Sequence, residues 1–334
     1  MSVPPIGPVA AALRAEVLAA AEAELAKALG AVAEAATETS APQARPPPAT
    51  AALDLARAAA AGRQGSLAPL FADLAQAAAS PDLPAPIRAA IAQVLALRLP
   101  LDGPLTTETV MRAVAQSGLF LEAHLAETAD PPPDLKAALL RLGAALTAAR
   151  GGEAAPQPPP KAPPPPVRGA ALAAQPATSA TLPKDAEAPT IAARLQGEVE
   201  QAVARQTLHQ LASAPDGPGA TWLFELPLVT PQGTSVAQFE VQRDGHEGAG
   251  EFVPGWRLRF SIDVEPLGPV HVHLGLAGER ASVTVWAERP QALEALRREA
   301  PALAQALPAE VVIHGGAPHA PAPPPPGSFL DRTS

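Results

Sequence analysis

Three histidines near the end of the chain have the residue type and spacing that suggest chemistry. His271 and His273 stand two residues apart in an alternating stretch, so they share one face of a predicted strand, and His314 lies in a later strand-like segment. Three imidazoles are a possible set of metal ligands. However, no carboxylate stands at a spacing that would complete the site, and valines fill the core side of the strand. We therefore predict solvent-side histidines, with no bound metal and no cofactor.

Catalytic motifs are also missing from the sequence. It contains no Walker loop, G-x-S-x-G elbow, H-E-x-x-H helix or Rossmann glycine pattern. Glu247 follows His246 in a glycine-rich loop, but no neighbouring group would support catalysis. The chain has no cysteine, which excludes disulfides, zinc ribbons and thiol catalysis. We predict no catalytic residue and no enzymatic activity.

Two kinds of side chain in the same region are suited to binding a protein partner. Trp286 falls on the strand face opposite Val283 and Val285, so it is either covered by the following helix, which we expect, or exposed as an aromatic anchor. Charges on a helix face are usually solvated, but four arginines could also meet an acidic or polar partner: Arg280, Arg289, Arg297 and Arg298.

Composition limits how much of the chain can form a core. There are 43 prolines among 334 residues, against a usual ~5%, and many stand in runs that favour extended, solvated chain. Aromatic residues make up 3%, and much of the apolar content is alanine. The net charge of −9, without a basic face, is atypical of nucleic-acid binding. The N-terminus lacks the pattern of a signal peptide or membrane span, so we expect the protein to start in the cytoplasm.

The first half of the chain has a helical pattern broken by prolines. Residues 8–36 favour a marginal helix, and residues 43–50 a proline-rich linker. Between residues 51 and 150, apolar residues recur at i, i+3, i+4 and i+7 in three or four segments, which predicts a small helical bundle. The segment 105–127 reads as one helix with Thr106 or Thr107 as its N-cap. Residues 151–188 are rich in proline and alanine and are predicted to be a disordered linker.

The last part of the chain has the pattern of a sheet. A helix is predicted to start near residue 189, followed by a hairpin in residues 221–243 and by strict alternation from Trp256 to Val264. Further strands follow the turn at 266–269, and a leucine-striped helix begins at Pro290. Pro301 inside that helix predicts two short pieces with a bend. With "AEVVIHG" as the closing strand, the pattern indicates an α+β domain: a mostly antiparallel sheet with a proline-kinked helix packed on one face.

The segment "DVEPLGPVHVHLGLAGERASVTVWAERPQALEALRREAPALAQAL" resembles the C-terminal domain of flagellar hook-length control proteins. Leu267, Gly268 and Val270 match the family's turn. Leu293, Leu296, Pro301 and Leu303 match its leucine-rich helix, and the likeness extends from Trp222 or Trp256 to Ile313. The tail "GSFLDRTS" departs from the family pattern.

The resemblance implies a protein that is exported through the flagellar type III channel while the hook grows. In that family a long N-terminal part senses hook length. The C-terminal domain then contacts the cytoplasmic domain of the export-gate switch protein, and export changes from rod-hook to filament substrates. Hook and hook-cap subunits are further implied partners, and we expect a monomer that binds neither nucleic acid nor membrane. Seven residues are predicted to contact a partner: Leu267, Gly268, Val270, Trp286, Leu293, Leu296 and Arg297.

The sequence thus predicts six regions. They are an N-terminal export region (1–42), a linker (43–50), a helical region (51–150), a second linker (151–188), the C-terminal α+β domain (189–316) and a disordered tail (317–334). An extended chain of this length reaches roughly 1,100 Å, enough for a molecular ruler. A second interpretation stays open, a cytoplasmic scaffold or adaptor that is not secreted and docks through its C-terminal domain.

Overall fold

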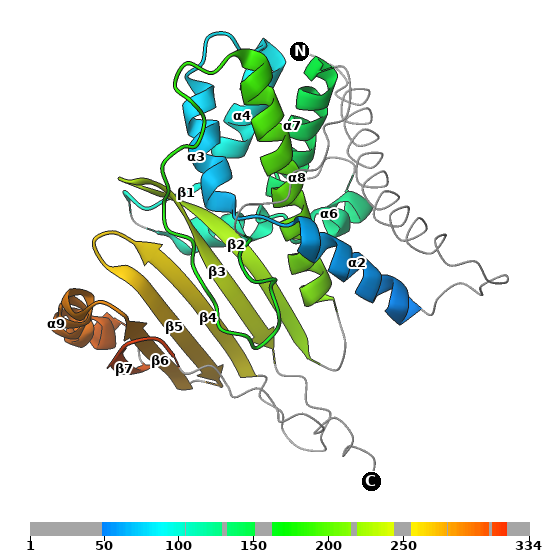
Figure 1. Cartoon of the computed structure of the whole chain (residues 1–334). Coiled ribbons are helices and arrows are strands. Elements are labelled where there is room, and N and C mark those ends of the chain that lie inside the picture. Colours follow the sequence, from blue (N-terminus) through cyan, green and yellow to red (C-terminus); the bar gives the residue numbers. More distant parts are fainter. Residues whose placement is uncertain are drawn as a thin grey trace, which may run out of the picture.

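The computed structural model describes residues 49–103, 105–128, 132–150, 162–214, 219–243, 255–278, 280–306 and 309–318. Figure 1 shows a helical bundle next to a broad sheet, with α9 and β7 at the far end of that sheet. The helix predicted for residues 8–36, most of the linker predicted for 43–50 and nearly all of the predicted tail lie outside the described residues.

The sheet has seven strands whose spatial order follows the chain order. Strands β2 to β6 form an antiparallel meander, whereas β1 pairs in parallel with β2 and β7 in parallel with β6. The mostly antiparallel α+β fold predicted from the sequence is therefore confirmed. The strands are β1 (Leu99–Pro100), β2 (Ala220–Thr230), β3 (Gly233–Arg243), β4 (Gly255–Val264), β5 (Gly268–Ala277), β6 (Arg280–Ala287) and β7 (Ala309–Gly315).

Alternation along the strands gives the sheet two chemically different faces, because successive side chains point to opposite sides. On the apolar face Phe239 stacks between Phe224 and Phe260, with ring centroids 5.2 and 5.4 Å apart. The polar face carries Glu225 on β2 and, further along the sheet, Trp286 on β6. Each face is covered by a different part of the chain.

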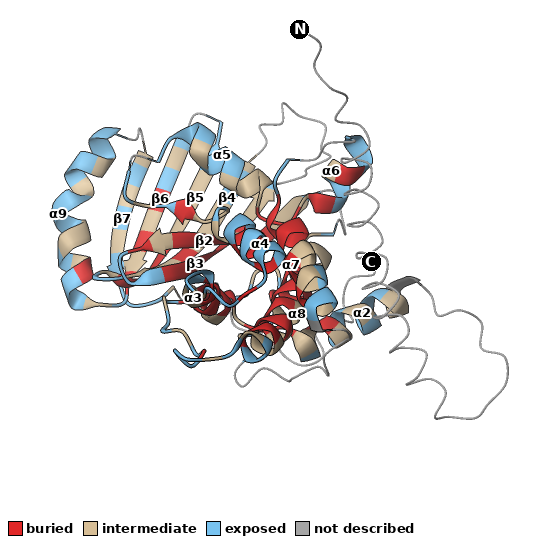
Figure 2. Cartoon of the chain, turned by 90° about the horizontal axis from the view of Figure 1, so that it is seen from above, coloured by how far each residue is buried: buried red, intermediate tan, exposed pale blue. Residues whose placement is uncertain are grey.

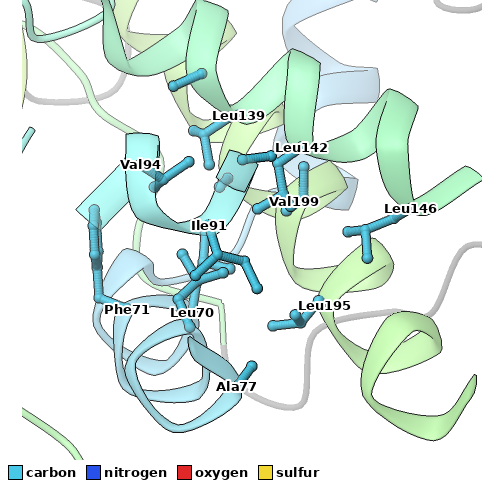
Figure 3. Packing of buried hydrophobic residues seen from close by; sticks show 14 of the residues in the cluster. Leu70, Phe71, Ala77, Ile91, Val94, Leu139, Leu142, Leu146, Leu195 and Val199 are labelled. Atoms are coloured by element: carbon cyan, nitrogen blue, oxygen red, sulfur yellow. The ribbon is translucent and has the colours of Figure 1, made fainter. Parts of the chain in front are cut away.

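The helices preceding the sheet form a bundle with its own core. The cluster contains buried residues of α3, α4, α7 and α8, and Figure 3 shows Leu70, Ile91, Leu142 and Leu195 directed toward one another. The predicted apolar stripes of these helices are thus the buried ones. The helices are α2 (Ala49–Arg63), α3 (Leu67–Ala78), α4 (Ala85–Leu95), α5 (Thr107–Ala115), α6 (Leu121–Glu127), α7 (Leu135–Arg150), α8 (Ala188–Ser213) and α9 (Pro290–Ala306).

The segment predicted as a single helix over 105–127 is divided into α5 and α6. Thr106 caps α5 by accepting a hydrogen bond from the backbone of Thr109. The break follows at Gly118, which has a φ of 95°, a conformation that a continuing helix of L-residues does not adopt. The division lets α5 pack on the apolar face of the sheet while Leu121 and Leu125 of α6 pack against α7.

Residues 162–187, which we call the strap, were predicted to be part of a disordered linker. They instead run as extended chain over the polar face of β2 to β4 (Figure 1). Gln175 forms an isolated antiparallel bridge with Val236, with N···O distances of 2.9 and 2.8 Å. Ala173 N donates to the side chain of Gln238 at 2.9 Å. The linker prediction is wrong for the strap because polar sheet side chains satisfy its backbone groups.

The bundle and the sheet are also in contact with each other. These contacts cross the region boundaries that were predicted at residues 150 and 189. Helix α8 contributes Leu195 and Val199 to the bundle core and also packs along β2. Val236 of β3 belongs to the same core cluster. The helices before the strap therefore pack with α8 and the sheet as one structure.

Helix α9 is continuous from Pro290 to Ala306, so the predicted division into two pieces is wrong. Pro301 removes one backbone donor inside the helix, an effect that normally costs about 3 kcal/mol or produces a kink. Leu296, one turn earlier, packs against Val270, Val283 and Val285 of the sheet. This packing on β6 and β7 holds the helix despite the proline.

A pair of buried carboxyl groups joins the strap to the bundle. Asp73 Oδ1 accepts hydrogen bonds from the backbone N of Thr181 and Leu182 at 2.5 and 3.1 Å. Burial, and then the neighbouring Asp73 carboxylate, raise the pKa of Glu198 to about 8. Arg194 Nε lies 2.8 Å from Glu198 Oε1 and 3.7 Å from Asp73 Oδ2. Glu198 is therefore mostly protonated at neutral pH.

The raised pKa of Glu198 predicts a pH dependence of stability. The unfolded chain ionises Glu198 near 4.5, whereas the folded chain keeps the proton until about pH 8. The contribution of this group is therefore complete below pH 4.5 and declines as pH rises toward 8, by at most about 1.4 kcal/mol per pH unit. Glu198→Gln should flatten the decline in urea-unfolding free energy over this range. Burial raises the pKa of Asp134 to about 6, and this group titrates in the wild-type protein and in the variant alike. Equal slopes of unfolding free energy against pH in the two proteins would therefore contradict the prediction.

Candidate partner-binding surface

Part of the apolar sheet face lies open between the elements that cover it. Helix α5 and residues near Leu119 cover the β2–β3 side, and α9 covers the β5–β6 side. Between them Trp256 and Leu276 are 38% and 45% exposed. We call Trp256 and Leu276, together with the half-buried Leu258 and Leu274 beside them, the open apolar surface. Large exposed apolar side chains grouped on one face are typical of a site that binds another protein.

The aromatic side chains at this surface are held in place by neighbours on adjacent strands. The rings of Trp222 and Trp256 stack with centroids 6.1 Å apart. The guanidinium carbon of Arg243 lies 5.6 Å from the ring centroid of Trp256. Sequence reasoning assigned Trp256 and Leu258 to a buried face. The alternation identifies the face correctly but does not show that none of the described helices covers this corner of the sheet.

The turn between β4 and β5 is built around Gly268, which matches the predicted turn. Gly268 is buried and has a φ of 70°, and a Cβ added there would lie 2.2 Å from Arg289 Nε. Arg289 Nη1 and Nη2 donate to Glu265 at 2.5 and 2.7 Å, and these hydrogen bonds lower the pKa of Glu265. The turn is thereby tied to the start of α9.

Four apolar residues predicted to contact a partner lie where α9 packs on the sheet. Val270 is buried, and Leu267 and Leu296 are half-buried in the same cluster. Leu293 Cδ2 lies 3.0 Å from where a Cβ on Gly315 would be. These side chains therefore pack between α9 and the sheet. That they contact a partner stays a prediction.

Trp286 lies on the opposite face from α9, so the expectation that this helix covers it is wrong. It is half-buried, with its ring 4.5 Å from that of His273 and 5.6 Å from that of His314. The register explains this, since Val283 and Val285 alternate with Trp286 and are the side chains that meet Leu296. Trp286 belongs to an aromatic and histidine-rich patch on the polar face of β5 to β7.

The three histidines do not come together around one point. His271 Nε2 lies 2.9 Å from Glu288 Oε1, whereas His273 and His314 contact the two sides of Trp286. Burial, followed by the charge of Arg259, lowers the pKa of His273 and favours its neutral form. Within the described ranges, no group of three or more metal-ligating side chains lies close enough to hold an ion.

The four arginines considered as partner contacts have different surroundings. Arg289 is paired with Glu265, whereas Arg280 at the start of β6 is exposed. Arg297 and Arg298 are exposed on α9 and can reach a partner without first breaking an internal contact of the turn.

A buried ion pair that the sequence did not indicate joins α8 to the sheet. Arg205 is the largest fully buried side chain among the described residues, and its Nη2 donates to Glu225 Oε1 at 2.7 Å. Its Nη1 donates to Gln64 Oε1 at 2.6 Å and to the Pro164 carbonyl at 2.8 Å. Burial alone would raise the pKa of Glu225, but Arg205 and His209 outweigh it and lower that pKa. The only available signal was the spacing of Arg205 and His209, four residues apart on a helix that precedes an apolar strand.

These features define an α+β protein whose candidate site is a surface for another macromolecule. Residues 253–313 match the family model described as Flagellar hook-length control protein FliK. The match covers β4 to β6, α9 and most of β7, so this end of the sheet contains a hook-length control domain, as the resemblance predicted. Members of this family are non-enzymatic flagellar assembly proteins. Membership of the family implies an interaction with the flagellar export apparatus. No curated protein and no solved structure matches the chain. None of the helices described here is long and apolar enough to cross a membrane.

Proposed function

We propose that this protein controls flagellar hook length and switches the export apparatus from rod-hook to filament substrates. The observation that carries the proposal is the family match at residues 253–313, which spans β4, β5, β6, α9 and most of β7. In the proposal the protein is itself exported while the hook grows. Its C-terminal domain binds the cytoplasmic domain of the export-gate switch protein, and its N-terminal part contacts hook and hook-cap subunits.

The open apolar surface is the proposed contact with the export gate. It lies inside the matched region on β4 and β5, and it carries a fixed aromatic side chain, the type that dominates binding energy at protein interfaces. Arg297 is the exposed member of the predicted partner set and lies on α9, much of which is exposed in Figure 2, whereas Trp286 is half-buried on the polar face. Leu267, Gly268, Val270, Leu293 and Leu296 act in the proposal by holding α9 and the turn beside this surface.

Leu276→Ala is expected to weaken binding of the full chain to the cytoplasmic domain of the export gate about tenfold. The side chain is exposed, so its removal should change the free energy of unfolding little. Leu53→Ala on α2 is the matched control, because Leu53 is 48% exposed against 45% for Leu276 and the substitution is the same. Isothermal titration calorimetry measures both. Equal affinities for the two variants would remove the open apolar surface from the proposal.

Export separates this proposal from the alternative of a cytoplasmic adaptor. An exported ruler must accumulate in the culture supernatant of cells that assemble hook-basal bodies and must be absent from the supernatant of export-deficient cells. An adaptor stays with the cells in both cases. Immunoblots of supernatant and cell fractions make the comparison, and retention of the chain in assembling cells would favour the adaptor.

A further inference from the structure

The two edges of the sheet differ in how they are protected. At the β2 edge, β1 pairs with Leu228 and Val229, and Ser213 Oγ accepts from Leu223 N at 2.8 Å. Pro227 lies in the same strand, and proline blocks strand addition because it has no N–H group. At the other edge, no described strand follows β7 in the sheet. Natural sheets usually protect a long edge strand, so an open β7 edge calls for an explanation.

Strand β7 itself has few of the usual protecting features. Helix α9 packs on the face that carries Val311 and Ile313. Glu310, Val312 and His314 on the other face are exposed, with Val312 at 37%. The strand contains no proline or lysine, and its seven residues are β-prone at the centre. It therefore presents backbone and side chains suited to pairing with a further strand.

The sequence of β7 is complementary to itself when a second copy runs antiparallel. If Val312 lies opposite Val312 of the second copy, Val311 lies opposite Ile313, and Ala309 opposite Gly315. Glu310 then lies opposite His314, and the two-fold symmetry places this acid–imidazole pair on both sides of the centre. All side chains keep their faces in this register, because the paired positions have the same parity.

We propose that β7 is a homodimer interface, in which two copies of this chain pair their β7 strands antiparallel about Val312 and join their sheets into one. A second copy fits better than an unrelated strand, because every position of the register is matched. Apolar residues and glycine lie opposite one another, and Glu310 lies opposite His314. This inference differs from the expected monomer, and it does not depend on the proposed binding of the export gate.

Sedimentation equilibrium of the full chain over a range of concentrations tests the dimer. The wild-type protein is expected to approach twice the chain mass of 33.8 kDa as concentration rises. His314→Glu places a second carboxylate opposite Glu310 at two symmetric positions and should raise the dissociation constant about tenfold. Val312→Lys brings two lysines together at the centre and should leave a monomer.

The double variant Glu310→Lys/His314→Glu restores opposite charges at both positions and should recover dimerisation. Recovery would show that loss in the single variant comes from charge pairing and not from misfolding or from the lost contact with Trp286. Glu294→Lys, which places the Glu-to-Lys change of the double variant at an exposed position of α9, should leave the dimer unchanged. A wild-type mass of one chain at every concentration, or a dimer that both His314→Glu and Val312→Lys leave intact, would overturn the proposal.

Discussion

Arg205→Met is expected to lower the free energy of unfolding by about 3–5 kcal/mol, because it leaves the buried Glu225 carboxylate without its cationic partner. Neither side chain of the pair has significant access to water, so water cannot replace the lost hydrogen bonds. The substitution also removes donors to Gln64 and Pro164, which come from the α2–α3 connection and from the strap. Urea unfolding followed by circular dichroism measures the loss.

Arg57→Met provides the matched control for this substitution. Arg57 pairs with Asp54 on the exposed surface of α2, and such pairs contribute about 0–1 kcal/mol. Adding Glu225→Gln to Arg205→Met should recover part of the stability, because no charge then stays buried without a partner. A loss below about 1 kcal/mol for Arg205→Met alone would contradict the role assigned to the ion pair.

Gly268→Val should destabilise the chain by about 2–3 kcal/mol and reduce the switch to filament export. A β-branched residue is strained at a φ of 70°, and its Cβ would enter the space of the Arg289 side chain. The turn would then lose the bidentate Arg289–Glu265 contact that ties it to α9. Thermal unfolding measures the first effect and filament counts measure the second.

Gly62→Val tests whether the effect is specific to the turn. Gly62 has open space around its Cβ position and no positive φ, so valine should change stability by less than about 0.5 kcal/mol. Filament numbers equal to wild type for Gly268→Val, at equal protein level, would count against a role of the turn in switching.

The described structure changes how a ruler mechanism would have to work. The described parts of residues 49–150 and the strap pack against α8 and the sheet instead of forming a loose tether. An extended measuring chain would need these contacts to open, and the Arg205–Glu225 pair lies where α8, the strap and β2 meet. In the proposed function, the chain is therefore extended during export and refolds when the C-terminal domain binds.

Local patterns in the sequence predicted much of the fold. The alternation from Trp256 to Val264 and the valines of β6 identified the strands, because period-two alternation reflects burial directly. The face on which α9 packs was predicted wrongly, since the helix was expected to cover Trp286 and packs on the face of Val283 and Val285 instead. The stripe of α8 was also predicted, since Ile191, Leu195, Val199 and Val203 are all buried. These features depend on neighbours in the sequence.

Features that depend on distant contacts could not be predicted in the same way. The strap looks disordered by composition, and only Gln238, Ser261 and Asp73 from other elements show why it is fixed. The continuity of α9 through Pro301 likewise depends on packing with β6 and β7. The candidate site could not be predicted for the same reason. The exposure of Trp256 depends on where α5 and α9 end on the sheet face, which the local sequence pattern does not show.

The proposed control of hook length is tested most directly by the hooks of cells that lack this chain. Electron microscopy of isolated hook-basal bodies gives the length distribution, and the account predicts overlong hooks without filaments, with normal hooks restored by the wild-type chain. Restoration should fail when the supplied chain lacks residues 253–313. Hooks of normal length that carry filaments in the absence of the chain would contradict the account.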